Sequence, residues 1–430
     1  MTVSVDSGLA PVRRALANGA VLIAQETAIH PAVTVQATLD AGSANDPAMR
    51  LGLASFTARV LDRGTEHKTA EQLARALDDR GVSLTIGVTR HLLSLTCTCL
   101  AEDLEPVVAI LGEVVRCPVF QADQVERRRA EIITSLRQDE DNPAAMASEA
   151  LMALIYPGGH PYGRPGEGTI ASVEAIARGD LVAFHRAHVT PHGFRLVIVG
   201  DVEPARALDL GEAVFGDWVT PAPPRLVLPG LDATSRRRLE ARHPIAGKAQ
   251  SDIAYGFRAI RRHDERYHAV VVMNNVLGQY GLGGRLGESI RERQGLAYYV
   301  YSTFDGNVAE GPLVIRAGVN PQDVERAVRS IDAEVGRMGR EGISARELED
   351  ARRYLVGSLP HMLETNADMA AFLHNAEYFQ LGLDYDRRLK GLFESVTREA
   401  VADVARTFLR PDEASVVVAG SQSGVSGAAA

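Results

Sequence analysis

The order of predicted elements repeats, and this repeat constrains the fold more than any other feature of the sequence. Each half opens with strand patterns and continues through a helix, alternating strands and long helices rich in arginine and glutamate. Each half then ends on a short β run that closes with glycine, at 196–200 and at 415–420. Two copies of one α+β unit are the simplest explanation.

A Pro-rich stretch at 221–229 separates the two halves. It predicts an N-terminal domain at 1–220, a linker at 221–235, a C-terminal domain at 236–420 and a tail at 421–430. The tail consists mainly of small and polar residues, and we therefore expect it to be disordered.

Charge and hydropathy argue against several classes of function. The net charge of −9 gives no electrostatic support to nucleic-acid binding. No apolar run approaches the roughly 20 residues that a membrane-spanning helix needs. Near the N-terminus, Asn18-Gly19 interrupts an apolar stretch and predicts a β-hairpin rather than a signal peptide. The three irregularly spaced cysteines fit a reducing compartment, so we expect a cytoplasmic protein without nucleic-acid or membrane partners.

Residues 52–65 carry the most specific motif, GLASFTARVLDRGT. This segment resembles the signature helix of the inverted zincins, the pitrilysin, insulinase and processing-peptidase family, whose pattern is Gly-Leu-Ala-His-Phe-x-Glu-His-x-Leu-x-x-Gly-Thr. The apolar and glycine positions match. Ser55, Ala58 and Arg59 stand in place of the first histidine, the glutamate base and the second histidine.

The resemblance extends over nearly the whole chain, and the order and spacing of its motifs make it specific. The further matching segments are at 40–43 (DAGS), 69–73 (TAEQL), 118–120 (PVF), 159–163 (GHPYG), 199–202 (VGDV), 284–286 (GRL) and 291–298 (RERQGLAY). The family implies two homologous α+β domains per chain, each a mostly antiparallel sheet flanked by helices, arranged as half of a clam-shell.

The residues at the expected metal site cannot bind a catalytic zinc ion, which requires three protein ligands and an open position for water. Ser55 is not a credible ligand, Ala58 cannot act as a base, and Arg59 is permanently cationic. The resemblance places the third ligand where Ser135 stands, just ahead of Asp141-Asn142-Pro143. We therefore expect no metal in this chain. Whether Arg59 pairs with Asp62 on the same helix is open.

Other groups of histidines have weaker claims to a metal. His361 with Glu364, and His374 with Glu377, each form a His-x-x-Glu pair, but neither is followed by a second histidine. The remaining cluster is His185, His188 and His192. Satisfied or solvent-facing histidines are the favoured interpretation. We likewise expect Cys97 and Cys99, two apart in an alternating strand, to be small buried or half-buried residues.

Arg291 and Tyr298 are seven residues apart, at the end of a predicted helix and the start of a predicted strand, with Gln294-Gly295 forming the turn. In active members of the family, an arginine and a tyrosine at this spacing bind the substrate backbone near the scissile bond. Guanidinium and phenol donors suit a peptide carbonyl on which charge develops. The alternatives are that Arg291 pairs with Glu288 on a solvated helix, or that Tyr299 or Tyr301 is the exposed phenol.

The family includes bacterial heterodimers in which one chain carries the zinc ligands and the other supplies the arginine and tyrosine. The sequence resembles the second kind. It predicts a non-catalytic substrate-binding subunit of a zinc metalloendopeptidase that acts on peptides or unfolded polypeptides. Zinc would be held by a homologous partner subunit, and Arg291 and Tyr298 would complete a composite site. The alternatives are an inactive structural scaffold and a peptide-binding homodimer of the same fold.

Overall fold

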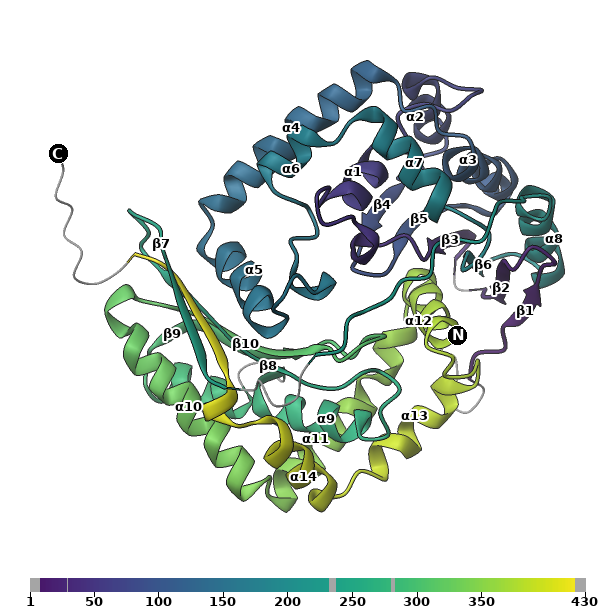
Figure 1. Cartoon of the computed structure of the whole chain (residues 1–430). Helices are drawn as coiled ribbons and strands as arrows, with labels where there is room; N and C mark the ends of the chain where they lie inside the picture. Colours follow the sequence, from purple (N-terminus) through teal and green to yellow (C-terminus); the bar gives the residue numbers. More distant parts are fainter. Residues whose placement is uncertain (1–7, 29, 232–236, 280–282, 422–430) are drawn as a thin grey trace, which may run out of the picture. The chain divides into compact units, whose positions relative to one another are not determined.

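The computed structural model describes residues 8–28, 30–231, 237–279 and 283–421. The chain divides into two compact units, each with one sheet and its own helices (Figure 1). Unit 1 contains Met1–Leu136, Pro165–Val227 and Leu359–Arg387, and unit 2 contains Arg137–Arg164, Leu228–Ser358 and Arg388–Ala430. The predicted class, α+β with two related sheets flanked by helices, is confirmed.

The sheet of unit 1 has six strands in the order β1-β2-β6-β3-β5-β4. β2 and β6 are parallel, and the other neighbouring strands are antiparallel. The strands are β1 Val12–Ala15, β2 Val21–Glu26, β3 Ala32–Leu39, β4 Thr85–Val88, β5 Leu93–Leu100 and β6 Arg195–Gly200. β1 and β2 form the predicted hairpin, in which Gly19 has a φ of 92° that favours glycine.

Helices cover this sheet and bury its apolar residues. They are α1 Leu53–Val60, α2 Ala70–Asp78, α3 Leu104–Arg116, α4 Ala122–Glu140, α6 Ile170–Ala175, α7 Arg178–His188, α8 Pro204–Phe215 and α12 Asn366–Tyr378. Helix α13 Tyr385–Glu394 begins in unit 1 and lies mostly in unit 2. Helix α2 begins with a capping box between Thr69 and Gln72. Along β5 the side chains alternate, and Cys97 and Cys99 point into the core as expected. Burial raises the pKa of the Cys97 thiol to about 12.

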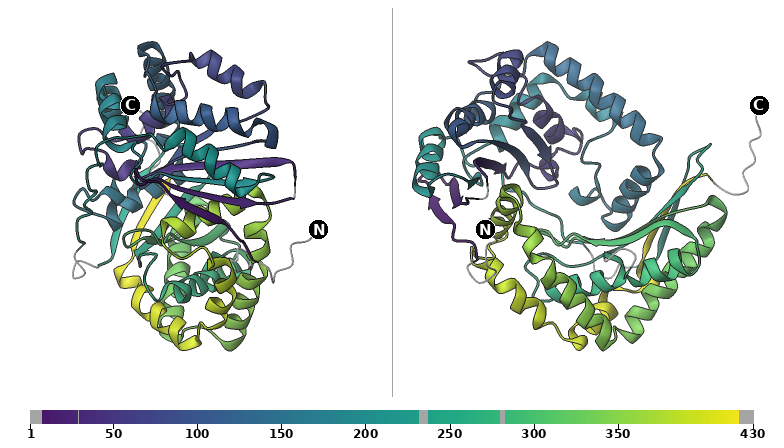
Figure 2. Two further views of the ribbon diagram at one scale, coloured as in Figure 1. Left: turned by 90° about the vertical axis from the view of Figure 1, so that its right-hand side faces the viewer. Right: turned by 180° about the vertical axis from the view of Figure 1, so that it is seen from behind.

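The sheet of unit 2 has five strands in the order β7-β11-β8-β10-β9, of which only β7 and β11 are parallel neighbours. The strands are β7 Leu239–Pro244, β8 Ser251–Arg258, β9 Ala297–Phe304, β10 Pro312–Val319 and β11 Ser415–Gly420. The helices are α5 Pro143–Ile155, α9 Tyr267–Asn274, α10 Val324–Glu341, α11 Ala345–Gly357 and α14 Arg398–Phe408, with π-helical segments η5 Asn275–Gln279 and η7 Gly287–Glu292. Helices α9, α10, α11 and α14 lie together on one side of the sheet, and α5 lies on the other (Figure 2).

The two sheets have the same topology, apart from the additional edge strand β1. In each, the first strand of the repeat pairs in parallel with the last, followed by the second, the fourth and the third. The two units do not correspond simply to the sequence before and after the linker, because the two halves exchange one equivalent helix. Helix α5 comes from the first half of the sequence but packs on β8 and β11, whereas α12 comes from the second half and packs on β3 and β6.

The predicted linker and the predicted tail are only partly included in the described residues. Residues 221–231 of the predicted linker have no regular secondary structure, and residues 232–235 lie outside the described residues. The predicted disordered tail also lies outside them, except for Ser421. In the part of the chain that is described, no helix is both long enough and apolar enough to cross a membrane.

Candidate functional site

The start of helix α1 is held by a buried carboxylate and by a close contact with the loop before α6. Asp46 is 4% exposed and accepts hydrogen bonds from the backbone N–H groups of Gly52 and Ala54, both at 2.8 Å. Gly52 has a φ of 84°, and a Cβ atom there would lie 2.4 Å from the carbonyl oxygen of Glu167. A Cβ atom at Gly168 would equally lie 2.4 Å from the carbonyl oxygen of Leu51. These glycines therefore allow the loop that carries Glu167 to lie directly against α1.

Glu167 contacts both residues that the resemblance aligns with the zinc-binding histidines. The Ser55 hydroxyl donates to Glu167 Oε2 at 2.7 Å, and Arg59 Nη2 donates to the same oxygen at 2.7 Å. The two positions that carry histidines in the family are thus linked by one carboxylate. Arg59 does not pair with Asp62, which forms an ion pair with Arg63 at 3.1 Å instead. Because a cation and its counter-ion occupy the site, its residues do not fit a zinc ion.

The positions of the base and of the third ligand also lack the required chemistry. Ala58 is 4% exposed and has no polar side-chain atom. Ser135 lies half-buried on α4, the helix that packs beside α1 with Arg129 over the Phe56 ring at 5.2 Å. Among the described residues, no three His, Cys, Asp or Glu side chains gather in a way that could hold a metal ion.

The histidines of the weaker candidate clusters have structural partners or face solvent. His185 Nε2 lies 2.8 Å from the Val115 carbonyl oxygen, and the His188 ring packs on Phe184 with centroids 4.6 Å apart. His192 is exposed, and the exposed His361 has its Nδ1 atom 3.0 Å from Oε2 of Glu364. His374 is 3% exposed, and burial together with the nearby Arg195 charge lowers its pKa to about 4. His185, His188, His192 and His361 therefore fit the favoured interpretation, whereas the buried Nε2 atom of His374 has no hydrogen-bond partner among the described residues.

Arg291 and Tyr298 lie at the predicted junction of a helix and a strand. Arg291 is in the last turn of η7, and the backbone N–H of Gly295 donates to its carbonyl oxygen at 3.0 Å. Gly295 has a φ of 62°, which explains the choice of glycine at this turn. Arg291 Nε lies 3.8 Å from Glu292, whereas Glu288 is instead 3.9 Å from Arg293. The guanidinium of Arg291 is therefore accessible and only loosely paired.

Tyr298 lies in a β-bulge on the edge strand β9. Tyr299 is opposite Gly318 and Ala297 is opposite Val319, so Tyr298 has no partner on β10. The next alternate residues, Val300 and Ser302, are buried, whereas Tyr298 is 61% exposed. A β-bulge turns a side chain away from the regular alternation of the strand. This bulge directs the Tyr298 side chain towards solvent.

The alternative phenols lie differently. Tyr299 is half-buried, and its hydroxyl donates to the buried carboxylate of Asp252. Burial and this hydrogen bond raise the pKa of Tyr299. Tyr301 is half-buried with its ring centroid 5.8 Å from that of Tyr299. Tyr298 is thus the most exposed of these three tyrosines.

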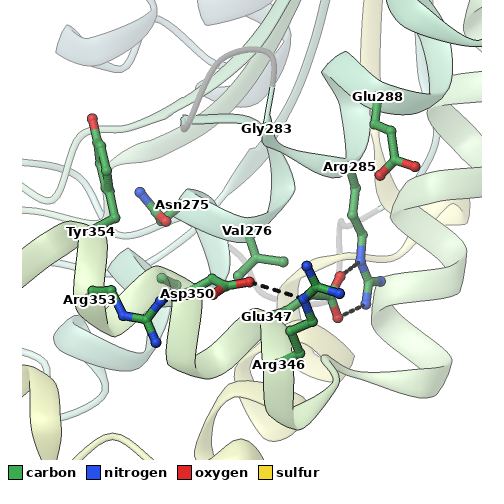
Figure 3. Close-up of a pocket in the computed structure, with 11 residues that line it drawn as sticks. Asn275, Val276, Gly283, Arg285, Glu288, Arg346, Glu347, Asp350, Arg353 and Tyr354 are labelled. Carbon is green, nitrogen blue, oxygen red and sulfur yellow. Dashed lines mark hydrogen bonds and ion pairs between the residues drawn. The ribbon is translucent and has the colours of Figure 1, made fainter.

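A separate cavity of about 730 Å³ opens beside α11 and is lined by charged residues (Figure 3). Arg285 makes a bidentate ion pair with Glu347 at 2.6 and 2.9 Å. Burial opposes the charge of Glu347, but hydrogen bonds from Arg285 and Ser344 more than offset it and hold the pKa of Glu347 at about 2. The described residues that line the cavity include three arginines and three acids but no serine, cysteine or histidine. The cavity therefore offers polar binding rather than nucleophilic chemistry.

Comparisons with known proteins agree with this fold over both halves of the chain. Residues 21–168 match the family described as "Insulinase (Peptidase family M16)", and residues 175–355 match "Peptidase M16 inactive domain". An "Uncharacterized zinc protease" of Mycobacterium tuberculosis is 28% identical over 409 residues, which cover 94% of this chain and 92% of the relative. The "Non-peptidase homolog YmxG" of Helicobacter pylori is 24% identical and covers 89% of this chain and 87% of its own length.

A solved structure supports the same assignment. The crystal structure of a peptidase M16 inactive domain from Pseudomonas fluorescens superposes with a TM-score of 0.88 at 26% identity, covering 96% of this chain and 98% of the other. A protease structure from Helicobacter pylori has the same TM-score at 16% identity, which shows the fold alone. The chain therefore belongs to peptidase family M16, the insulinase family.

Proposed function

We propose that the chain is a non-catalytic, substrate-binding subunit of a heterodimeric zinc metalloendopeptidase that acts on peptides or unfolded polypeptides. The observation that carries the proposal is the Ser55–Glu167–Arg59 contact, in which an ion pair occupies the positions of the zinc-binding histidines. The printed name of the Helicobacter pylori relative, "Non-peptidase homolog", supports a role without zinc chemistry.

The partner in this proposal is a homologous chain that carries the intact zinc ligands and the glutamate base. Zinc bound there would activate water and polarise the scissile carbonyl. Arg291 and Tyr298 of this chain would hold the substrate backbone through exposed donors, which the loose pairing of Arg291 and the bulge at Tyr298 leave accessible. The peptide would add as a strand to a sheet edge of the partner, where backbone hydrogen bonds give affinity without a strict sequence preference.

The test is reconstitution of this chain with a zinc-bearing homologue and cleavage of a fluorogenic peptide. We expect Arg291→Ala to lower kcat by about 10²-fold, in line with the loss of one donor to a developing oxyanion, and Tyr298→Phe to lower it by a smaller factor. Arg293→Ala is the matched control because Arg293 is a neighbouring exposed arginine with an equally loose partner. Cleavage by the isolated, metal-free chain at the rate of the pair would contradict the proposal.

A second candidate function is that of a structural scaffold, which would not use Arg291 or Tyr298. Unchanged activity of the pair with Arg291→Ala would favour the scaffold. Absence of a zinc-bearing relative among the chains that co-purify with this one would favour a peptide-binding homodimer. We also propose a cytoplasmic location, since Cys97, Cys99 and Cys117 are free thiols, and cell fractionation tests it.

A further inference from the structure

One side of the unit 2 sheet is only partly covered by helix α5. Leu313, Ile315 and Ala317 of β10 are fully buried on one side of the strand. Val314 points to the opposite side and belongs to the apolar core beneath α5. Arg316, two residues further on, therefore points to the same side as Val314.

Helix α5 covers the part of this side that is formed by β8 and β11. It lies close over Gly256, where a Cβ atom would be 2.9 Å from Ile155 and 3.0 Å from Leu151. On β10, Val314 is opposite Gly256, and Arg316 lies two residues further along the strand. Arg316 is opposite Ala254 of β8 and Tyr301 of β9. The sheet surface around Arg316 is therefore formed by β10 and the edge strand β9.

Arg316 is half-buried but has no counter-ion among the described residues. Among the described residues, none forms an ion pair or a hydrogen bond with its guanidinium, and its Nε atom is buried without a partner. Two other arginines of unit 2 with little side-chain exposure do have a counter-ion: Arg258 lies 3.0 Å from Glu310, and Arg285 lies 2.6 Å from Glu347. A partly desolvated charge without a partner is unfavourable, and a bound carboxylate would compensate it.

Asp252, which lies on this side of the sheet, is already engaged by other groups. Tyr299 donates to Asp252 across Gly318, where a Cβ atom would lie 2.5 Å from the Tyr299 ring and 2.4 Å from Gln250 Nε2. Gln250 also donates to both oxygens of Asp252 at 3.2 Å. Asp252 is therefore held by a phenol and an amide, and it is not within ion-pair distance of Arg316.

We propose that Arg316 binds a carboxylate of a peptide, with the Tyr301 hydroxyl as a second donor. The proposal rests on the peptide-binding function proposed above. Guanidinium and carboxylate form short, charge-assisted hydrogen bonds that are often bidentate. Within the described chain, the Tyr301 hydroxyl makes no hydrogen bond that would compete, and Tyr301 lies directly opposite Arg316 on the neighbouring strand. The ligand is thus an acidic peptide, through its C-terminal carboxylate or through an Asp or Glu side chain.

The experiment measures binding of fluorescently labelled unstructured peptides to the full isolated chain by anisotropy. Three peptides share one sequence: an acidic form, a form with Asp and Glu replaced by Asn and Gln, and a form with an amidated C-terminus. We expect the acidic form to bind at least about tenfold more tightly than one of the two neutralised forms, since about 1.4 kcal/mol corresponds to tenfold in Kd. The form that loses affinity identifies the source of the carboxylate.

Variants connect this preference to Arg316. We expect Arg316→Gln to remove the preference while leaving the affinity for the neutralised peptide unchanged, and Tyr301→Phe to reduce it. Arg242→Gln is the control because Arg242 lies in the same sheet but already pairs with Glu325. A preference that persists in Arg316→Gln, or equal binding of all three peptides, would overturn the role of Arg316 alone. If the wild-type chain binds none of them, both the role of Arg316 and its peptide-binding function fail.

Discussion

At the scale of single residues, we expect the ion pair between Arg59 and Glu167 to contribute only a small stabilising energy. Arg59 and Glu167 are 43% and 47% exposed, and pairs with this exposure contribute about 0.2–1 kcal/mol. We expect a coupling energy in this range from a double-mutant cycle of Arg59→Met and Glu167→Gln, measured by urea denaturation.

Salt distinguishes this charge interaction from simple packing. The coupling should shrink in about 1 M NaCl, because the Debye length there is only about 3 Å. The Glu71–Arg75 pair on α2 is a matched control with higher exposure, and its coupling should be smaller. A coupling of zero between Arg59 and Glu167 at low salt would show that the contact has no energetic role.

The buried His374 predicts how stability depends on pH. Its pKa in the folded chain is about 4, below the value of about 6.5 in an unfolded chain. Between these pH values the unfolded state binds a proton that the folded state does not. The free energy of unfolding therefore carries no penalty from His374 above about pH 6.5, and it falls as the pH is lowered towards 4.

The variant that tests this dependence is His374→Phe. It keeps a ring next to Tyr378, since the ring centroids of His374 and Tyr378 are 5.8 Å apart. Urea denaturation at several pH values should give a shallower slope for this variant between pH 4 and 6.5. The slope should not vanish, because burial also lowers the pKa of His91 and His268 to about 4. An unchanged slope would mean that His374 does not titrate in this way, and the exposed His361→Gln serves as the control.

Local patterns predicted the residues at the degenerate site but not their contacts. Ser55, Ala58 and Arg59 could be recognised because their neighbours match a contiguous motif. Glu167 could not, because it lies 108 residues from Arg59 in a loop whose only signal is the flanking pair of glycines. Arg316 was missed for a similar reason, since the absence of a counter-ion is a property of the packed sheet.

At the scale of elements, helix α5 contributes to the stability of strands that are distant in sequence. Leu151 is fully buried against β8 and β11, in the core it shares with Ala254 and Val417. Leu151→Ala should lower the free energy of unfolding by about 2–5 kcal/mol. Hydrogen exchange should become faster in β8 and β11 as well as in α5, because these elements form one core.

The control for Leu151 is Val219→Ala, since Val219 is 83% exposed and should be close to neutral. Faster exchange confined to α5 would contradict the packing of this helix on β8 and β11.

The element order, the Asn18-Gly19 hairpin and the Gly295 turn were predictable because each depends on neighbouring residues. The bulge at Tyr298 was not, because it depends on the register between β9 and β10.

At the scale of the whole molecule, the exchange of helices means that neither half of the sequence is a complete folding unit. A fragment of residues 236–430 lacks α5, so an apolar surface that includes Ala254, Val314 and Val417 would be exposed to water. We expect this fragment and the fragment 1–220 each to aggregate or to lack a cooperative thermal transition, as measured by circular dichroism.

Co-expression of the two fragments is the complementary test. Each would supply the helix that the other lacks, and the pair should recover a cooperative transition. Cooperative thermal unfolding of residues 236–430 alone, with a transition as steep as that of a folded domain of this size, would contradict this expectation.

The repeat was predictable from the order of elements. The exchange of helices was not, because it concerns which sheet a helix packs on.

The same helix exchange has a consequence for synthesis on the ribosome. Unit 1 lacks its own α12 until residues 366–378 have emerged, and α5 has no complete sheet to pack on until β11 at 415–420 has been made. Although domains generally fold in the order in which they are translated, here unit 1 is incomplete until α12 has emerged and unit 2 is incomplete until β11 has emerged. Translation must therefore continue through α12 and β11 before the two cores can close, and until then the growing polypeptide displays apolar surface that chaperones can bind.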